Sequence, residues 1–549
     1  IFTQRWYLCA MISQKKQLFL LSVLSGLLFA FSWPTYGFSP FLFIGFVPLL
    51  AVEKIIFQNP DRYKNIHVFF YAYLAFIIWN VIATWWVVEA SLVGGIIAMV
   101  CNTLLMSLVF MLFHITRKRT NEITGYFALV AYWISFEYIH LNWDLSWPWL
   151  TLGNGFSTSY KWIQWYEYTG VFGGGLWILI VNILVFIVLK KIFFEHKNWK
   201  QQWKRMLFII VIIITPIAFS LHRYYSYQET KNPVNVTVVQ PNVDPYSEKF
   251  SGDFQTQVKK MLALGKTKTD STTDYLVFPE TALTEDIWER EFQNSISIGI
   301  IKSFLKNYPH LKIVIGATTN RVYNKGDTIS ATARKFRDAD QYYDSYNTAL
   351  QIDNTGKIQV YHKSKLVPGV EKMPFPSLMK PFEKLAINLG GTTGSLGIQK
   401  ERSVFYASDN KAIIAPVVCY ESIYGEYVGG YIRKGANLIF IITNDGWWGN
   451  TQGYKQHASY ASLRAIETRR DIARSANTGT SCFLNQRGDI SQATNWWQPA
   501  VIKGVVNTNS VITFYSEHGD YIAHLLMYCA AILLIVTFFG KLFLKNKFF

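Results

Sequence analysis

The sequence predicts two kinds of structure in one chain, a multi-span α-helical membrane domain of about eight transmembrane helices and an exported α/β domain. Three observations predict this division. Long apolar stretches occur before and after one long, more polar block. Clusters of Lys and Arg follow alternate stretches. Within the polar block, short β-branched runs alternate with segments of helical pattern.

Each apolar stretch is a candidate membrane span, because a helix of about 20 mostly apolar residues satisfies its own backbone hydrogen bonds in the hydrocarbon core. The predicted spans are Leu18–Phe31, Phe38–Ile56, Ile66–Val88, Leu92–Ile115, Tyr126–His140, Gly173–Phe193, Met206–His222 and Tyr521–Phe543. The first and fifth are short for a span. We therefore expect a membrane domain over 1–225, a catalytic domain over 226–515, and a last span with its tail over 516–549.

Lys and Arg in the short loops predict orientation, since cytoplasmic loops carry the excess of positive charge. Basic residues precede the first span and follow the second, fourth, sixth and eighth. They are Arg5, Lys15, Lys16, Lys54, Arg62, Lys64, Arg117, Lys118, Arg119, Lys190, Lys191, Lys197, Lys200, Lys204, Arg205, Lys541, Lys545 and Lys547. This alternation predicts cytoplasmic termini and a periplasmic domain, in the inner (cytoplasmic) membrane of a bacterium.

Composition argues against nucleic acid as a partner and against a bound metal ion. The formal charge of +17 does not indicate nucleic acid, because many basic residues lie in the cytoplasmic loops, where orientation and anionic lipid explain them. The five cysteines show neither CxxC nor Cys/His spacing, so we expect no metal site and no cofactor. Only Cys419 and Cys482 lie in the exported domain, and the sequence leaves a disulfide between them open.

The exported domain begins near Pro233, where the pattern changes to short β-branched runs. Predicted strands are Val234–Gln240, Tyr275–Phe278, Lys312–Gly316, Tyr346–Ile352, Ile358–Tyr361, Ala412–Val418 and Leu438–Thr443. Predicted helices are Phe254–Gly265, Glu291–Asn307 and His457–Arg474. The turn Asp353–Gly356 links two of the strands as a hairpin. Strands that alternate with helices predict a layered α/β domain.

Four polar motifs lie at the ends of predicted strands, where α/β proteins place their chemistry. They are Phe278–Glu280, Tyr361–Pro368, Cys419–Glu421 and the Gly- and Trp-rich turn Asn444–Gly449. Taken singly, each has a structural explanation. A lone buried thiol is most often a small hydrophobic residue, a glutamate can cap a helix, and a lysine can be a solvated charge.

Taken together, the motifs supply the groups for acyl transfer through a thioester. A thiol needs a base to become a thiolate, and the carboxylate of Glu280 after an apolar strand can serve. A lysine can stabilise the oxyanion of a tetrahedral intermediate. The competing arrangement is a Cys–His pair. Its candidate histidines are His362, His457 and His518, none of which follows an apolar strand as Glu280 does.

The four motifs, in this order, resemble the carbon-nitrogen hydrolase or nitrilase superfamily, which implies an α-β-β-α sandwich. The arrangement of spans resembles its membrane-bound branch, the apolipoprotein N-acyltransferases. The matching motifs are FPETA at Phe278–Ala282, YHKSKLVP at Tyr361–Pro368, CYE at Cys419–Glu421 and NDGWWG at Asn444–Gly449. In the membrane half, the likeness rests on Glu137 in a WxxxE pattern, the Pro148-Trp149-Leu150 loop and Asn182.

The resemblance implies Glu280 as general base, Lys363 as oxyanion-stabilising lysine and Cys419 as nucleophile. Lys365 is out of register with the lysine motif. The implied supporting residues are Glu371, Tyr420 and Glu421. Glu371 stands at the glutamate of the family's LVPFGE pattern, although the two residues before it differ. A tryptophan that the family uses near the first strand is not evident, because Lys249 and Phe250 occupy that region.

The activity that the resemblance implies is a two-step N-acyl transfer that completes lipoprotein maturation. Cys419 takes an acyl chain from a phospholipid, in the family the sn-1 chain of phosphatidylethanolamine. It then passes the chain to the α-amine of the N-terminal diacylglyceryl-cysteine of an apolipoprotein. We expect these two partners, together with membrane lipid, no nucleic acid, and a monomer.

Two other functions remain open. A membrane-tethered nitrilase-type amidase would use the same residues and pass the acyl group to water, and a transporter or scaffold would only bind. The spans favour the transferase, because a soluble substrate needs no lipid-facing bundle and because few charges are paired within the spans. We also expect a lid that dips toward the bilayer, with a plain surface loop as the alternative. Its apolar residues are Met373, Phe375, Leu378, Met379 and Phe382.

Overall fold

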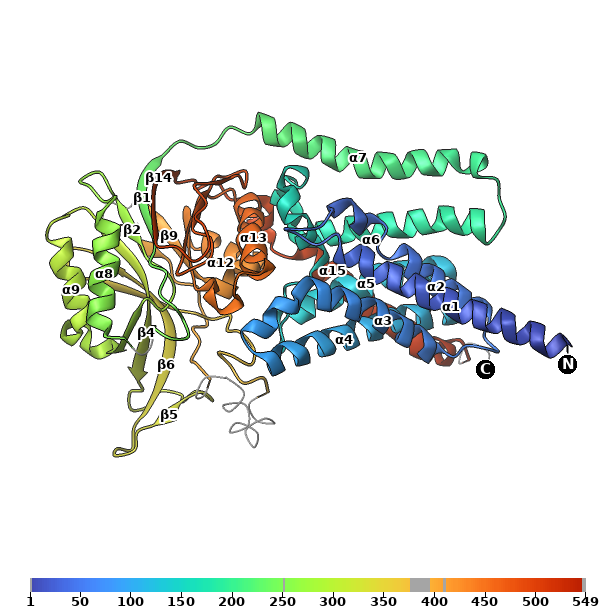
Figure 1. Cartoon of the computed structure of the whole chain (residues 1–549), viewed down its shortest axis with the longest axis horizontal. Helices are drawn as coiled ribbons and strands as arrows, with labels where there is room; N and C mark the ends of the chain where they lie inside the picture. Colours follow the sequence, from blue (N-terminus) through green and yellow to red (C-terminus); the bar gives the residue numbers. More distant parts are fainter. Residues whose placement is uncertain (1, 250–251, 376–394, 408–410, 546–549) are drawn as a thin grey trace. The chain divides into compact units, whose positions relative to one another are not determined.

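A computed structural model describes residues 2–249, 252–375, 395–407 and 411–545 (Figure 1). The chain divides into two compact units. The first, here called the helical unit, comprises Ile1–Trp85, Gly94–Tyr225 and Asp520–Phe549. The second, here called the sheet unit, comprises Trp86–Val93 and Ser226–Gly519. The segment Trp86–Val93 therefore groups with the sheet unit, although it lies within the predicted membrane half.

The helical unit is built from long apolar helices. They are α1 (Phe2–Ala30), α2 (Val47–Gln58), α3 (Asn65–Thr84), α4 (Leu92–Arg119), α5 (Glu122–Leu141), α6 (Tyr166–Phe193), α7 (Trp203–Ser226) and α15 (Tyr521–Lys545). Within the described residues, six helical segments are long and apolar enough to cross a membrane. They are Ser39–Gln58, Asn65–Glu89, Leu92–Arg119, Tyr166–Phe193, Trp199–Ser226 and Tyr521–Gly540. The other two predicted spans correspond to α1 and α5, so a count of eight crossings stays a prediction.

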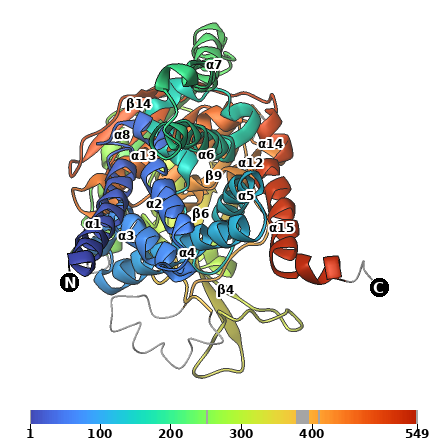
Figure 2. The ribbon, with the colours of Figure 1, turned by 90° about the vertical axis from the view of Figure 1, so that its right-hand side faces the viewer.

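Buried polar side chains join the helices of this unit, because an unpaired polar group in an apolar bundle is costly. Asn182 on α6 accepts a hydrogen bond from the backbone N–H of Phe46 and donates to the carbonyl of Leu42, each over 2.7 Å. Glu137 on α5 accepts the backbone N–H of Leu152 over 2.9 Å. Helix α15 packs beside α5, far from it in sequence (Figure 2). The C-terminal helix is thus part of the bundle.

The sheet unit contains two sheets among the described residues. The first has eight strands in the order β14-β1-β2-β4-β6-β5, with β3 paired to β4 and β7 to β6. Its strands are β1 (Pro233–Gln240), β2 (Tyr275–Val277), β3 (Leu283–Trp288), β4 (Lys312–Val322), β5 (Arg334–Lys335), β6 (Tyr342–Ile352), β7 (Ile358–His362) and β14 (Ala500–Asn507). Strands β1, β2 and β4 run parallel. Their carboxyl ends therefore lie along one edge.

The second sheet has six strands in the order β13-β12-β11-β10-β9-β8. They are β8 (Phe405–Tyr406), β9 (Ile413–Val418), β10 (Leu438–Thr443), β11 (Ile472–Ala476), β12 (Cys482–Leu484) and β13 (Ile490–Ser491). Strands β9, β10 and β11 run parallel and are buried along nearly their whole length. Such continuous apolar runs are typical of parallel strands covered on both faces.

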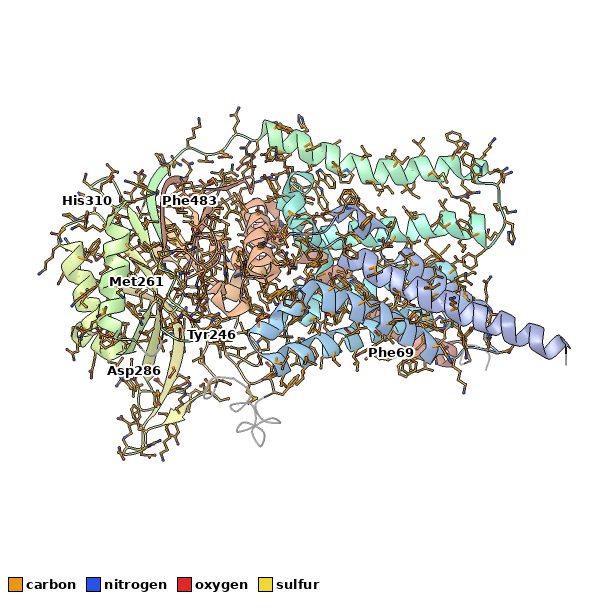
Figure 3. All side chains as sticks on the ribbon, in the orientation of Figure 1. Phe69, Tyr246, Met261, Asp286, His310 and Phe483 are labelled. Carbon is orange, nitrogen blue, oxygen red and sulfur yellow. The ribbon has the colours of Figure 1, made fainter. Side chains whose placement is uncertain are left out.

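The two sheets pack against each other and helices cover their outer faces. Ring contact joins Tyr275 on β2 to Phe440 on β10, with centroids 5.2 Å apart. Helices α8 (Phe254–Lys266) and α9 (Ile296–Leu305) cover the eight-stranded sheet, and Met261 on α8 belongs to their shared core (Figure 3). Helices α12 (Gly425–Arg433) and α13 (Gln452–Thr468) cover the other sheet. The predicted α-β-β-α sandwich is confirmed.

The predicted elements agree with this sandwich in type, but several boundaries differ. Strand β4 ends six residues later than predicted, β6 begins four residues earlier, and α9 begins at Ile296 rather than at Glu291. The predicted helix His457–Arg474 is wrong at its end, because α13 stops at Thr468 and Ile472–Ala476 forms strand β11. Arg469 ends the helix in a left-handed conformation, with φ of 50°. The sequence offers no glycine at that position to indicate the stop. Helix α12 was not among the predicted elements, and neither were strands β3, β5, β8, β11, β12, β13 and β14.

Candidate active site

Glu280 lies three residues beyond the end of β2, in a tight turn against β4. The next residue, Thr281, has a φ of 46°, which non-glycine residues adopt only under strain. Gly316 on β4 makes room for the turn, since a Cβ there would lie 2.4 Å from the backbone nitrogen of Thr281 and 2.6 Å from Cα of Glu280. The strand and its glycine therefore fix where this buried carboxylate points.

Lys363 follows β7 immediately and its ammonium is buried between two carboxylates. Its Nζ lies 2.9 Å from Oε1 of Glu280 and 2.8 Å from Oε1 of Glu371. The Lys363 backbone N–H donates to the carbonyl of Asn347 over 2.8 Å. Although burial alone would lower the pKa of Lys363, the charges of Glu280 and Glu371 hold it well above its usual value. Lys363 is therefore a permanent cation.

Asn347 on β6 ties the two carboxylates together. Its Nδ2 donates to Oε1 of Glu280 over 2.7 Å and to Oε1 of Glu371 over 3.0 Å. The second oxygen of Glu371 accepts the backbone N–H of Val367 over 2.8 Å. Burial would raise the pKa of Glu280, but the charge of Lys363 and these hydrogen bonds hold it below its usual value. Glu280 is thus an ionised carboxylate, able to accept a proton.

Cys419 follows β9 directly, in the turn that begins the short 3-10 helix Cys419–Ile423. Its φ is 49°, so the thiol sits on a strained turn between strand and helix. Burial, followed by the charge of Glu280, raises the pKa of the thiol, and the charge of Lys363 acts in the opposite direction. The thiol is therefore neutral at rest and needs a base to react.

A hydrogen bond joins the two sheets at this point. The backbone N–H of Asn444, which follows β10, donates to Oε2 of Glu280 over 3.1 Å. Glu280 and Lys363 come from the eight-stranded sheet, whereas Asn444 and Cys419 come from the six-stranded sheet. The site therefore lies where strand ends from both sheets meet.

Glu421 anchors the turn that carries Cys419. Its Oε2 accepts the backbone N–H of Val418 over 2.9 Å, and its Oε1 accepts the hydroxyl of Tyr361 and the backbone N–H of Ser364 over 2.6 and 2.7 Å. Burial raises the pKa of Glu421. Tyr420 is buried beside it, with its ring 5.3 Å from that of Tyr424. Both supporting residues thus lie at the turn rather than with Glu280.

A buried charge network supports the other side of the turn. Asp445 accepts a hydrogen bond from Arg474 over 2.7 Å and contacts Nδ1 of His457 over 2.9 Å. Nε2 of His457 lies 2.9 Å from the hydroxyl of Ser422 and 3.2 Å from the carbonyl of Cys419. This histidine therefore contacts the backbone of Cys419.

The other two histidines considered as thiol partners have different neighbours. Nε2 of His362 lies 2.5 Å from Oε1 of Glu289, and its ring stacks on Tyr346. Nδ1 of His518 lies 3.0 Å from the carbonyl of Phe514. Cys482, buried on β12, carries a free thiol, as does Cys419.

Sequence reasoning missed three residues at the site: Asn347, Tyr361 as a partner of Glu421, and Lys249 as a buried cation. Asn347 could have been noticed, because asparagine is uncommon inside strands and stands in an otherwise β-forming run. Lys249 is buried, with Nζ 3.4 Å from the carbonyl of Glu280 and hydrogen-bonded to the hydroxyl of Thr281. Only the fold brings it there.

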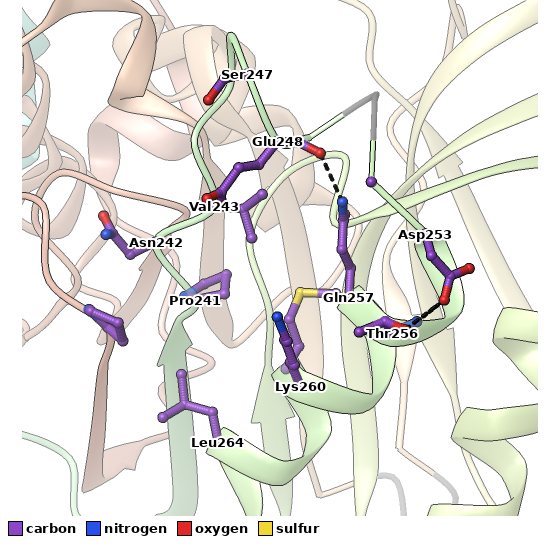
Figure 4. Close-up of a pocket in the computed structure, with 13 residues that line it drawn as sticks. Pro241, Asn242, Val243, Ser247, Glu248, Asp253, Thr256, Gln257, Lys260 and Leu264 are labelled. Carbon is purple, nitrogen blue, oxygen red and sulfur yellow. Dashed lines mark hydrogen bonds between the residues drawn. The ribbon is translucent and has the colours of Figure 1, made fainter.

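A cavity of about 570 Å³ lies between α8 and the loop that follows β1 (Figure 4). Gln257 lines this cavity, and its side-chain amide donates a hydrogen bond to the carbonyl of Glu248 over 2.9 Å. A separate space of about 10 Å³, about the size of one water molecule, shares four lining residues with this cavity and reaches Glu280 and Lys249. The four shared residues are Pro241, Val243, Gln257 and Met261. A mixed polar and apolar space thus borders the wall of the site.

The segment expected to form a lid is described only at its ends. The backbone N–H of Met373 donates to the hydroxyl of Ser395 over 2.9 Å, and Phe375 is partly exposed. Leu378, Met379 and Phe382 lie outside the described residues, as does Phe250. The lid stays a prediction.

Comparison with known proteins follows the same division of the chain. A family model described as carbon-nitrogen hydrolase matches residues 235–514, and one described as apolipoprotein N-acyltransferase N-terminal domain matches residues 25–184. The apolipoprotein N-acyltransferase of Chlorobaculum tepidum is 29% identical, over 94% of this chain and 96% of its own. That of Geobacter metallireducens is 26% identical, over 95% and 96%. A nitrilase-superfamily structure from Saccharomyces cerevisiae, 14% identical with a TM-score of 0.37, covers 53% of this chain and 96% of its own.

Proposed function

The chain belongs to the carbon-nitrogen hydrolase family and, within it, to the apolipoprotein N-acyltransferases, and we propose that it passes a phospholipid acyl chain through a Cys419 thioester to a lipoprotein amine. One observation carries the proposal. An ionised carboxylate, a permanent cation and a neutral thiol converge where strands of two sheets end. These are the base, the oxyanion stabiliser and the nucleophile of acyl transfer.

The first step forms the acyl-enzyme. Glu280 accepts the thiol proton of Cys419 while Sγ forms a bond to the ester carbonyl carbon of the phospholipid. The carbonyl oxygen becomes an oxyanion, which the Lys363 ammonium stabilises. The ester C–O bond then breaks, and the proton on Glu280 passes to the departing oxygen of the lysophospholipid. The acyl chain remains on Cys419 as a thioester.

The second step consumes the thioester. The neutral α-amine of the diacylglyceryl-cysteine attacks the thioester carbon, and Glu280 accepts one proton of the amine. The C–S bond breaks and the proton on Glu280 returns to Sγ, which leaves an amide on the lipoprotein and a free thiol on the enzyme. The same carboxylate therefore serves both steps.

The supporting residues act through the three reacting groups. Glu371 and Asn347 hold the Lys363 ammonium and the Glu280 carboxylate at fixed positions. Glu421 and Tyr420 hold the turn of Cys419. Such fixed donors and acceptors cost little reorganisation when charge develops.

The membrane spans give the reaction its setting. Both proposed substrates are anchored in lipid, so a lipid-facing bundle brings their carbonyl and amine groups to one site. We propose phosphatidylethanolamine, through its sn-1 chain, as the donor, a periplasmic sheet unit, cytoplasmic termini and a monomeric enzyme. The apolar helices and the relatives support a multi-pass membrane protein of bacteria.

The decisive experiment is mass spectrometry of the intact purified protein in detergent micelles that contain phosphatidylethanolamine. We expect a fatty-acyl adduct that maps to Cys419, is absent from Cys419→Ala, and is lost when a diacylated lipopeptide is added. The matched control is Cys482→Ala, because Cys482 is the other buried thiol of the sheet unit in the described residues. That variant should retain the adduct.

The products separate the alternatives. Appearance of the triacylated lipopeptide supports the transferase. An adduct that decays only to free fatty acid would indicate the amidase type of chemistry, in which water is the acceptor. Absence of any adduct would contradict the thioester and leave a binding role.

A further inference from the structure

A second lysine is buried against the turn that carries Glu280. Lys249 belongs to the segment between β1 and α8, and only 4% of its surface is exposed. Its Nζ lies 3.4 Å from the carbonyl oxygen of Glu280 and donates to the hydroxyl of Thr281. It therefore contacts both residues of the strained turn that Gly316 on β4 accommodates.

The charges of the site explain why a cation is needed there. Lys363 contacts both Glu280 and Glu371, so its single positive charge faces two negative charges. Removing a proton from Cys419 next to a carboxylate would be unfavourable, because like charges in a low-dielectric site repel strongly. A buried ammonium at Lys249 offsets that charge.

The groups that face Lys249 come from several elements. Glu280 and Cys419 favour its charged form, and Lys363 opposes it. From α8, the neighbours in the same small space are Gln257 and Met261, which carry no charge. Burial is the largest influence and lowers the pKa of Lys249 to about 8. Unlike Lys363, this ammonium can lose its proton within the working range of an enzyme.

We propose that Lys249 is a positioning residue of the acyl-transfer site, whose ammonium fixes the turn presenting Glu280 and supplies positive charge beside Cys419 when Cys419 gives up its proton. This inference rests on the proposed function. It predicts that formation of the acyl-enzyme slows as Lys249 is deprotonated, whereas Lys363 stays charged throughout.

The test measures the rate of Cys419 acylation from phosphatidylethanolamine in a single turnover without acceptor, from about pH 6 to about pH 10. Omitting the acceptor keeps its α-amine, which titrates near pH 7.7–8.0, out of the profile. For the wild type we expect the rate constant to fall above about pH 8. Lys249→Met should slow acylation about tenfold or more at pH 7. This is the effect expected if loss of the ammonium raises the pKa of the Cys419 thiol by about one unit or more.

Lys249→Arg separates charge from packing, because a guanidinium stays charged over this range. We expect it to retain acylation and to move the alkaline fall to higher pH. The matched control is Lys260→Met, which removes an exposed lysine from α8 at the wall of the cavity and should leave the profile unchanged. Thermal midpoints of all variants in detergent show whether they are folded.

Two results would overturn the inference. One is a folded Lys249→Met that acylates at the wild-type rate. The other is that Lys249→Met and Lys249→Arg slow acylation equally, and that the acylation rate of both still falls above the same pH as in the wild type. That result would mean that the side chain only fills space. A wild type that forms no adduct at any pH would instead contradict the proposed function itself.

Discussion

The hydroxyl of Tyr361 donates a 2.6 Å hydrogen bond to Oε1 of Glu421. Tyr361 belongs to β7, two residues before Lys363, and Glu421 belongs to the turn of Cys419. This bond therefore joins the strand that precedes Lys363, the proposed oxyanion stabiliser, to the turn of the proposed nucleophile, across the interface of the two sheets. Both side chains are fully buried, so the bond is shielded from water.

Removing this hydroxyl should weaken the junction of the sheets. A buried hydrogen bond to a carboxyl group contributes about 1–2 kcal/mol, so Tyr361→Phe should lower the thermal midpoint and slow acylation of Cys419. The control is Tyr406→Phe on β8, whose side chain is half exposed. Equal midpoints and rates for the two variants would show that the junction does not depend on this bond.

Glu280→Gln tests the proposed base. The amide keeps the shape of the side chain but cannot accept the thiol proton, and removal of a general base typically costs about a hundredfold to ten-thousandfold in rate. We expect acyl-enzyme formation to fall by that amount, measured by intact mass against time. Glu401→Gln, at an exposed glutamate, is the control. Near-normal acylation in Glu280→Gln would assign the proton transfer to another group.

Gly316→Ala tests how closely β4 must approach the turn of Glu280. The added Cβ would lie within 2.7 Å of three backbone atoms, so the turn must move and acylation should be lost. Gly299→Ala on α9 is the matched change, because no heavy atom lies within 4 Å of its added Cβ. It should keep full activity and gain up to about 1 kcal/mol in stability. Full activity in Gly316→Ala would mean that Glu280 tolerates displacement.

The Asp445 network predicts an acid dependence of stability. Burial would raise the pKa of Asp445, but the charges of Arg474 and His457 hold it at about 2. Because this value lies below that of an aspartate in the unfolded chain, about 3.9, the contribution is complete above about pH 4 and is lost as the pH falls toward 2.

Thermal midpoints between about pH 2 and about pH 7 provide the measurement. Asp445→Asn should lower the midpoint at neutral pH, because it leaves Arg474 buried without its carboxylate, and should reduce the slope on the acid side. Asp338→Asn, at an exposed aspartate, should follow the wild type. An unchanged acid slope in Asp445→Asn would assign the acid dependence to other carboxylates.

The strands that position the proposed site were predictable from sequence because they are continuous apolar runs. Leu438–Thr443 was predicted to the residue, and β1, β2, β7 and β9 to within one. Strand β11 was mistaken for the end of a helix, because its Ala, Arg and Ser residues carry little strand preference and it owes its strand to burial between β10 and β12. Its pairing partners are a tertiary property.

The site residues also divide into those that the local sequence indicates and those that only the fold brings to the site. Glu280, Lys363 and Cys419 stand directly after apolar strands, a local signal. Asn347 has only a weak local signal, an asparagine inside a strand, and Lys249 has none, because each becomes a site residue only when distant segments meet. The long strand β6 brings Asn347 to both carboxylates, and the loop after β1 brings Lys249 to the turn of Glu280.

The division of the reacting groups between two sheets has a consequence for the newly made protein. The thiol of Cys419 comes from one sheet, and the carboxylate of Glu280 with the ammonium of Lys363 comes from the other. A chain whose sheets have not yet joined therefore holds an inert thiol, with no base beside it. The three groups come together only in the finished sandwich, so under the proposed function an unfinished chain could not deacylate membrane lipids during biogenesis.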